Sequence, residues 1–167
     1  MNGTLHTVDG RPTLRFERRL KHPVEKVWQA LTEPQQLSKW FPQDIEGDFT
    51  AGGRLRFLFR EGEWPAFDGE VVEVDPPRVL AYLWGEDVLR FELAPDGDGC
   101  LLVFTDTIVD LGKAARDGAG WDVCLGALTS ALDGGPAPVN RWDEFYLGYS
   151  DVFGPDAATA PIPGRDS

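Results

Sequence analysis

The chain has 167 residues, of which 42% are hydrophobic and 26% are charged. This composition is typical of one folded domain with a buried core. Its 16 lysine and arginine residues against 28 aspartate and glutamate residues give a net charge of −12 at pH 7. A chain this acidic repels phosphate groups and anionic lipids, so we expect neither nucleic acid nor a membrane surface as a partner.

Residues that common cofactors require are scarce. The two histidines, His6 and His22, lie far in sequence from Cys100 and Cys124, so the sequence predicts no zinc site. No nucleophile elbow and no glycine-rich nucleotide loop is present, so we predict no catalytic residue, no metal and no cofactor. The first residues do not resemble an export signal, and we therefore expect a cytoplasmic protein with reduced thiols.

The first elements form a strand followed by two short helices. After an irregular start, apolar and charged residues alternate over Thr13–Leu20, which predicts a half-buried strand. Pro23 suits the first position of a helix, and an apolar stripe at helical spacing runs from Val24 to Leu31. A second helix restarts at Thr32-Glu33-Pro34 and ends before Pro42.

A run of strands and turns follows, with about ten residues between turns, as in an antiparallel sheet built from hairpins. We predict strands over Asp44–Phe49, Arg54–Arg60, Phe67–Asp75, Arg78–Trp84, Val88–Leu93 and Cys100–Val109. The apolar period then changes to that of helices, over Gly120–Leu132 and Asn140–Phe153. Residues 154–167 are small, polar and rich in proline, and we expect a mobile tail there.

This order predicts an α+β fold in a single domain over residues 1–153. A curved antiparallel sheet of about seven strands would wrap around the long C-terminal helix, because that helix is long enough to cover one face of the sheet. Two short helices would follow the first strand. Aromatic side chains of the sheet and of the helix would then line a cleft between them.

Five segments resemble a known superfamily. They are His22–Phe41, Gly52–Phe57, Gly69–Pro77, Leu80–Trp84, and Gly120-Trp121 with the later Leu125, Leu128, Leu132 and Gly134. Together they resemble the helix-grip, or START-like (SRPBCC), superfamily, and most closely its branch named for the C-terminal domain of the activator of the heat-shock-protein-ninety ATPase. The resemblance spans about residues 13–153.

The resemblance implies a seven-stranded sheet that grips the C-terminal helix around an apolar cavity. Members of the superfamily include lipid and small-molecule binders, polyketide cyclases, self-resistance proteins and cochaperones. Close relatives often carry a histidine in the last long strand at the position where this chain has Asp106. Chemistry that depends on that histidine is therefore not expected here.

The candidate ligand-binding residues are those that the pattern turns toward the cleft. Strand alternation points Phe57, Phe59, Trp84, Phe91, Phe104 and Asp106 inward, the long helix adds Trp121 and Leu125, and Trp40 and Phe41 stand at the expected mouth. Packing alone would also explain most of the aromatic residues. An inward carboxylate such as Asp106 needs a partner or a raised pKa, so it is either a structural salt bridge or a polar anchor for a ligand.

We therefore predict binding of a hydrophobic small molecule, aromatic or polycyclic, between the sheet and the long helix. A cochaperone-like protein-binding module and a polyketide cyclase or lyase are the alternatives. A filled core with an exposed apolar patch would favour a protein partner. An enzyme would require at least two polar groups that converge inside the cavity.

Overall fold

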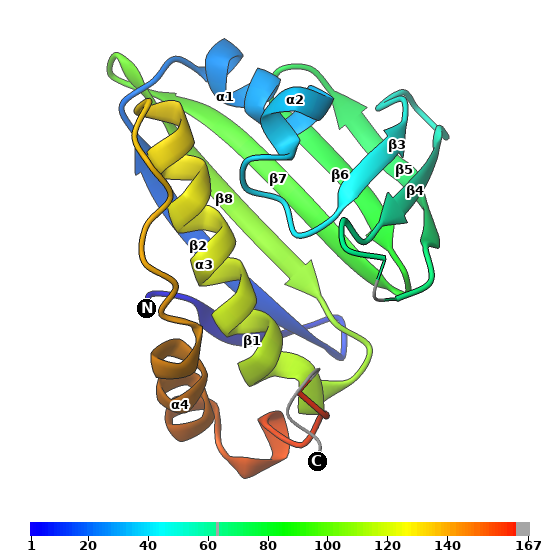
Figure 1. Ribbon diagram of the computed structural model, residues 1–167, viewed down its shortest axis with the longest axis vertical. Coiled ribbons are helices and arrows are strands. Elements are labelled where there is room, and N and C mark those ends of the chain that lie inside the picture. Colours follow the sequence, from blue (N-terminus) through cyan, green and yellow to red (C-terminus); the bar gives the residue numbers. More distant parts are fainter. Residues whose placement is uncertain (63, 163–167) are drawn as a thin grey trace.

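The computed structural model describes residues 1–62 and 64–162, in which eight strands form one antiparallel sheet (Figure 1). The strands are β1 (Thr4–Val8), β2 (Arg11–Leu20), β3 (Asp44–Gly47), β4 (Arg54–Leu58), β5 (Phe67–Asp75), β6 (Val79–Trp84), β7 (Asp87–Asp96) and β8 (Gly99–Thr107), in the spatial order β1-β2-β8-β7-β6-β5-β4-β3. The helices are α1 (Val24–Thr32), α2 (Pro34–Leu37), α3 (Ala114–Leu132) and α4 (Trp142–Phe153), with single 3-10 turns η1 (Leu111–Lys113) and η2 (Pro155–Ala157).

The predicted α+β helix-grip architecture is confirmed, with one strand more than expected. The additional strand is β1, which pairs with β2 through the tight turn at Asp9-Gly10. Both turn residues have positive φ, 51° and 79°, as the turn of a two-residue hairpin requires. An Asp-Gly pair is itself a hairpin signal, but β1 is largely exposed and lacks the apolar alternation that marks the other strands.

The long helix α3 packs across the concave face of the sheet (Figure 1). Its stripe of Trp121, Leu125 and Leu128 is at most 2% exposed. Opposite it, β8 alternates so that Leu102, Phe104 and Asp106 are fully buried. The inward direction predicted for Asp106 is therefore confirmed.

The helix α3 begins at Ala114, six residues before the predicted start at Gly120. Asp110 caps η1 by accepting a hydrogen bond from the Gly112 amide at 2.9 Å, and η1 continues directly into α3. Gly118 and Gly120 lower the helix propensity of this first part and obscure its start in the sequence. The added turns carry Arg116 and Asp117 into the helix, and both residues matter for the site.

The helix α4 packs on the outside of α3 and is joined to it by a buried polar network. The hydroxyl of Tyr149 donates to Asp122 Oδ2 and accepts from the Gly3 amide at 2.7 Å. Arg18 pairs with the other oxygen, Asp122 Oδ1, at 2.8 Å. Burial, followed by the hydrogen bond to Asp122, raises the pKa of Tyr149, so the phenol stays neutral. This network joins β2, α3, α4 and the N-terminal residues.

Residues 154–162 pack against the body of the protein, which differs from the mobile tail expected over 154–167. Ala157 is buried, and the amides of Thr159 and Ala160 donate to the Gly112 carbonyl at 3.1 and 3.0 Å. A Cβ atom at Gly112 would lie 2.2 Å from Thr159 Oγ1, so a side chain at this position would displace the Thr159 hydroxyl. Residues 163–167 of the expected tail lie outside the described residues.

Within the described ranges, we find no helix that combines the length and the apolar character needed to span a membrane.

Candidate functional site

A pocket with a volume of about 1090 Å³ lies at one end of the sheet, beside the first turns of α3. It is formed by the segment before β3, the β4–β5 connection, the β6–β7 turn, the starts of α3 and α4, and the C-terminal segment. Its lining residues are Gln43, Phe59, Trp64, Phe67, Trp84, Gly85, Glu86, Asp87, Lys113, Arg116, Asp117, Asn140, Trp142, Pro161 and Ile162.

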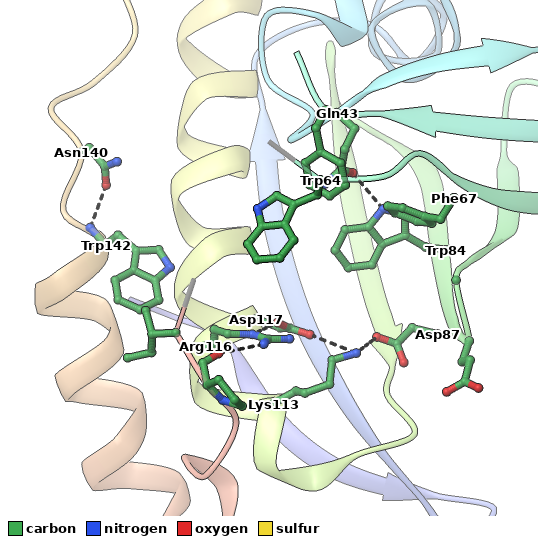
Figure 2. A pocket seen from close by; sticks show the side chains of 15 residues that line it. Gln43, Trp64, Phe67, Trp84, Asp87, Lys113, Arg116, Asp117, Asn140 and Trp142 are labelled. Atoms are coloured by element: carbon green, nitrogen blue, oxygen red, sulfur yellow. Dashed lines mark hydrogen bonds and ion pairs between the residues drawn. The ribbon is translucent and has the colours of Figure 1, made fainter. Parts of the chain in front are cut away.

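One wall of the pocket is aromatic. The Trp84 indole donates to Gln43 Oε1 at 2.9 Å and meets Phe67 edge-on with ring centroids 6.0 Å apart. Phe59 packs against Phe67 at 5.9 Å. Trp64 is 52% exposed, and Figure 2 shows its ring between the Trp84 side of the pocket and α3. Because Trp84 and Phe67 are held by neighbours, this wall offers preformed faces to a flat apolar molecule.

The floor of the pocket is charged. Lys113 Nζ lies 2.6 Å from Asp87 Oδ2 and 3.8 Å from Asp117 Oδ2. Arg116 Nε lies 3.0 Å from the other oxygen, Asp117 Oδ1 (Figure 2). Burial acts to lower the pKa of Lys113, but the hydrogen bond to Asp87 and the charge of Asp117 outweigh it and raise that pKa. Lys113 is therefore a cation at neutral pH.

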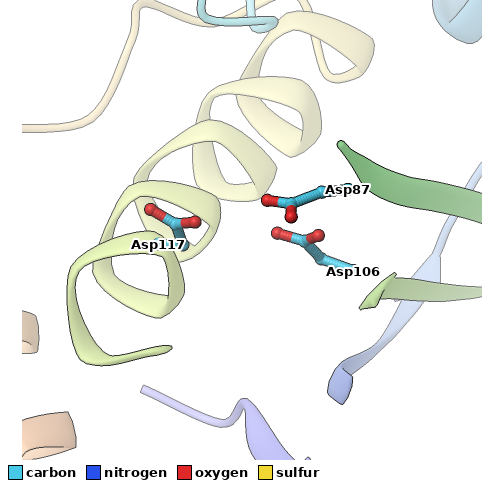
Figure 3. A group of neighbouring side chains, drawn as sticks. All are labelled: Asp87, Asp106 and Asp117. Atoms are coloured by element: carbon cyan, nitrogen blue, oxygen red, sulfur yellow. The ribbon is translucent and has the colours of Figure 1, made fainter. Parts of the chain in front are cut away.

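Asp106 lies beside this floor and is fully buried. Its Oδ2 accepts a hydrogen bond from Trp121 Nε1 at 2.8 Å. Candidate ligand atoms of Asp87, Asp106 and Asp117 all lie within 4.8 Å of one another, and Figure 3 shows the first two facing Asp117 on α3. Burial, followed by the charges of Asp117 and Asp87, raises the pKa of Asp106 well above its usual range. The structure thus gives Asp106 a raised pKa instead of a direct salt bridge.

Two of the ten predicted ligand-binding residues, Phe59 and Trp84, line this pocket. The other eight are at most 4% exposed and lie in the core: Trp40, Phe41, Phe57, Phe91, Phe104, Asp106, Trp121 and Leu125. Their rings pack on one another, for example Phe91 on Phe104 at 4.7 Å and Phe104 on Trp121 at 4.8 Å. Aromatic side chains therefore fill the space where the sequence predicted a cleft, and the pocket lies at its end.

Several lining residues were not identified from the sequence. Asp87 is the first residue of β7 and lies one position before the predicted strand Val88–Leu93, while Trp64, Asn140 and Trp142 come from loops or a helix start. Lys113 and Asp117 have the i, i+4 spacing of an ion pair on a helix, which would have indicated their contact had the helix been predicted to begin earlier.

Comparison with solved structures finds the same fold in bacterial proteins. A conserved protein of unknown function from Enterococcus faecalis, EF2215, is 19% identical over 90% of each chain, with a TM-score of 0.79. CalU16 from Micromonospora echinospora is 22% identical, with 95% of this chain and 98% of that chain covered and a TM-score of 0.71. DynU16, a protein in the dynemicin biosynthetic locus, is 26% identical over 77% of this chain and 50% of its own, with a TM-score of 0.66.

No curated protein sequence matches this chain. A family model described as activator of Hsp90 ATPase homolog 1-like protein matches residues 21–133, which include α1, the strands from β3 to β8 and α3. Since this match covers more than half of the chain, the protein belongs to the family of activator of Hsp90 ATPase homolog 1-like proteins.

Proposed function

We propose that this protein binds a hydrophobic small molecule with a flat aromatic or polycyclic body in the pocket beside α3. The observation that carries the proposal is the aromatic lining, namely Phe59, Trp64, Phe67, Trp84 and Trp142, around a volume of about 1090 Å³. Ligand pockets commonly measure ~300–1,000 Å³ and are lined by apolar and aromatic side chains with few polar groups. The proposed site is the end of the cleft that the sequence predicted, since the centre of that cleft is filled.

A small molecule is favoured over a cochaperone-like protein partner. Among the described residues, the exposed large apolar side chains are spread over several elements, as Val8 in β1, Val72 in β5 and Leu147 in α4 illustrate. A docking surface would gather them into one patch. The place of DynU16 in a biosynthetic locus also supports a small-molecule ligand. We propose a cytoplasmic location and neither a nucleic-acid nor a membrane partner.

The test uses methylanthracene, a flat apolar probe, titrated against the protein and followed by anthracene emission. We expect saturable binding with one site per chain. Trp84→Leu removes one aromatic face and should weaken binding about tenfold, the effect of ~1.4 kcal/mol. Trp28→Leu, at a half-buried tryptophan of α1 outside the pocket lining, is the matched control.

Circular dichroism shows whether each variant is folded before its binding is compared. Loss of binding in Trp84→Leu but not in Trp28→Leu supports the pocket. Binding that does not saturate, or equal weakening by both substitutions, contradicts the proposal.

A polyketide cyclase or lyase is the second candidate, because polar groups converge on the pocket as an enzyme requires. Asp117 could accept a proton from carbon, since burial raises the pKa of this carboxyl and makes it a stronger base. Lys113 Nζ, 3.8 Å from Asp117 Oδ2, could polarise the adjacent carbonyl. Deuterium exchange into an aromatic β-diketone in D₂O, followed by NMR, tests this activity. Exchange that is lost in Asp117→Asn would establish it, and exchange no faster than in buffer would exclude it for this probe.

A further inference from the structure

The hydrogen bonds of the acidic cluster beside the pocket are incomplete. Both oxygens of Asp87 are used, because Oδ1 accepts from the Val109 amide at 3.1 Å and Oδ2 from Lys113. Asp106 and Asp117 each have one oxygen in a hydrogen bond, to Trp121 and Arg116. Among the described residues, the remaining oxygens, Asp106 Oδ1 and Asp117 Oδ2, are buried and have no hydrogen-bond donor.

Two unpartnered buried oxygens in one cluster point to a missing donor. A buried polar atom without a partner is costly, so native proteins usually satisfy it with a neighbouring group, a water molecule or a ligand. The Asp117 side chain is only 8% exposed, yet the residue lines the pocket. The carboxylates of Asp106 and Asp87 face Asp117 from the sheet (Figure 3). A donor that enters from the pocket therefore meets Asp117, and the fully buried Asp106 carboxylate, which does not line the pocket, lies within 4.8 Å of that residue.

The charges of the cluster are also unequal. Three carboxylates, Asp87, Asp106 and Asp117, face two cations, Lys113 and Arg116. In the free protein a bound proton can make up the difference, because burial raises the pKa of both Asp106 and Asp117. One further positive charge would balance the ionised cluster. Buried charges are stable only when they are paired in this way.

The aromatic wall is suited to the same kind of group. Faces of tryptophan and phenylalanine rings attract cations, tryptophan most strongly. Trp64, Trp84 and Phe67 line the same pocket as Asp117. A cation bound at the floor would therefore be attracted by the carboxylates and by neighbouring rings, while anions would be repelled.

This inference rests on the proposed small-molecule function: we propose that the natural ligand carries a primary alkylamine on an aromatic body and binds in its ammonium form. The ammonium group donates to Asp117 Oδ2 and Asp106 Oδ1, and the apolar body lies against Trp64, Trp84 and Phe67. Binding replaces the proton that the free cluster holds, so this proton leaves to solvent as the ammonium enters.

The test compares four anthracenes that differ only in one substituent: aminomethyl, hydroxymethyl, methyl and carboxylate. We expect the amine to bind about 10- to 100-fold more tightly than the methyl probe, the range of a charge-assisted hydrogen bond, and the carboxylate to bind most weakly. In Asp117→Asn the ratio between amine and methyl affinities should fall toward one. Asp98→Asn, which removes an exposed carboxylate in the β7–β8 turn, is the control for net charge and should keep the ratio.

Proton release gives a second readout. The affinity for the aminomethyl probe should rise as the pH is raised above the ordinary aspartate pKa of about 4, because the protons on Asp106 and Asp117 become easier to remove, whereas the affinity for the methyl probe should stay constant. Groups that face this pair are Asp87, Lys113, Arg116 and the Trp121 indole. Equal pH profiles for the two probes would contradict the proposed exchange.

The outcomes separate the two proposals. If no probe binds, the proposed function fails. If the methyl or carboxylate probe binds as tightly as the amine, the pocket binds apolar molecules but the inferred amine specificity is wrong. A rise in melting temperature with millimolar Mg²⁺ or Ca²⁺ that Asp117→Asn abolishes would assign the carboxylates to a metal ion and also overturn the inference.

Discussion

Replacing Asp106 with asparagine should make the protein more stable above neutral pH. An acid whose pKa is higher in the folded than in the unfolded protein binds more protons when folded. The free energy of unfolding therefore falls as the pH rises from the unfolded pKa of about 4 to the folded pKa, by at most about 1.4 kcal/mol per pH unit for one group. Burial places Asp106 in this class.

Asparagine removes this charge and preserves the local contacts. Its amide oxygen can accept from Trp121 Nε1 as Asp106 Oδ2 does, and its NH₂ group faces the unpartnered Asp117 Oδ2. We expect Asp106→Asn to exceed the wild type in free energy of unfolding by at least about 1 kcal/mol at about pH 8, and by progressively less at lower pH. In this variant the free energy of unfolding should change less steeply with pH than in the wild type. Some pH dependence should remain, because burial also raises the pKa of Asp117.

Urea denaturation across this pH range, followed by tryptophan fluorescence, measures the effect. Asp98→Asn, at an exposed position, reports the change in net charge alone and should leave the pH dependence of the free energy of unfolding unchanged. Two results would contradict the prediction: an Asp106→Asn variant less stable than the wild type at about pH 8, or a free energy of unfolding that changes with pH as steeply as in the wild type. Either result would show that Asp106 is ionised and well paired in the folded protein.

Three further predictions concern the packing of α3, the polar network and the absence of a cofactor. Leu128→Ala leaves a cavity under α3 and should cost about 2–5 kcal/mol by urea denaturation, whereas a loss under about 1 kcal/mol would be that of a surface residue. Tyr149→Phe removes the donor to the buried Asp122 and should cost about 1.5–3 kcal/mol, and an unchanged melting temperature would mean that Asp122 has another donor. Chelation with EDTA should leave the melting temperature unchanged, and stoichiometric metal whose removal lowers it would contradict this.

The fold could be predicted because its apolar patterns are strong and consistent. Alternation over β8 placed Phe104 and Asp106 correctly on the inner face, and the helical stripe placed Leu125 and Leu128 on the sheet. Such patterns report which face is buried. They do not report whether a buried aromatic ring meets a ligand or another ring, and Phe91 and Phe104 turned out to stack on each other.

The pocket was harder to predict because its parts come from element ends. Trp64 comes from a loop, where no periodicity exists to orient a side chain, and the helical period that includes Trp142 does not show that this residue faces a pocket. Asp87 and Lys113 are brought together by tertiary packing across 26 positions of sequence. Sequence spacing can indicate contacts within one helix, but the register between a strand end and a helix start is fixed only when the whole domain is folded.

The C-terminal segment has a practical consequence for expression and affinity tags. Pro161 and Ile162 form part of the pocket rim, and the Pro161 carbonyl accepts from Arg116 Nη1 at 3.0 Å, on the same guanidinium that pairs with Asp117. A purification tag fused directly after this segment, or a truncation before residue 161, would therefore disturb the ligand entrance and the charge of its floor together. Ligand screens are better run on untagged protein, released by protease from an N-terminal fusion, so that the native rim is retained.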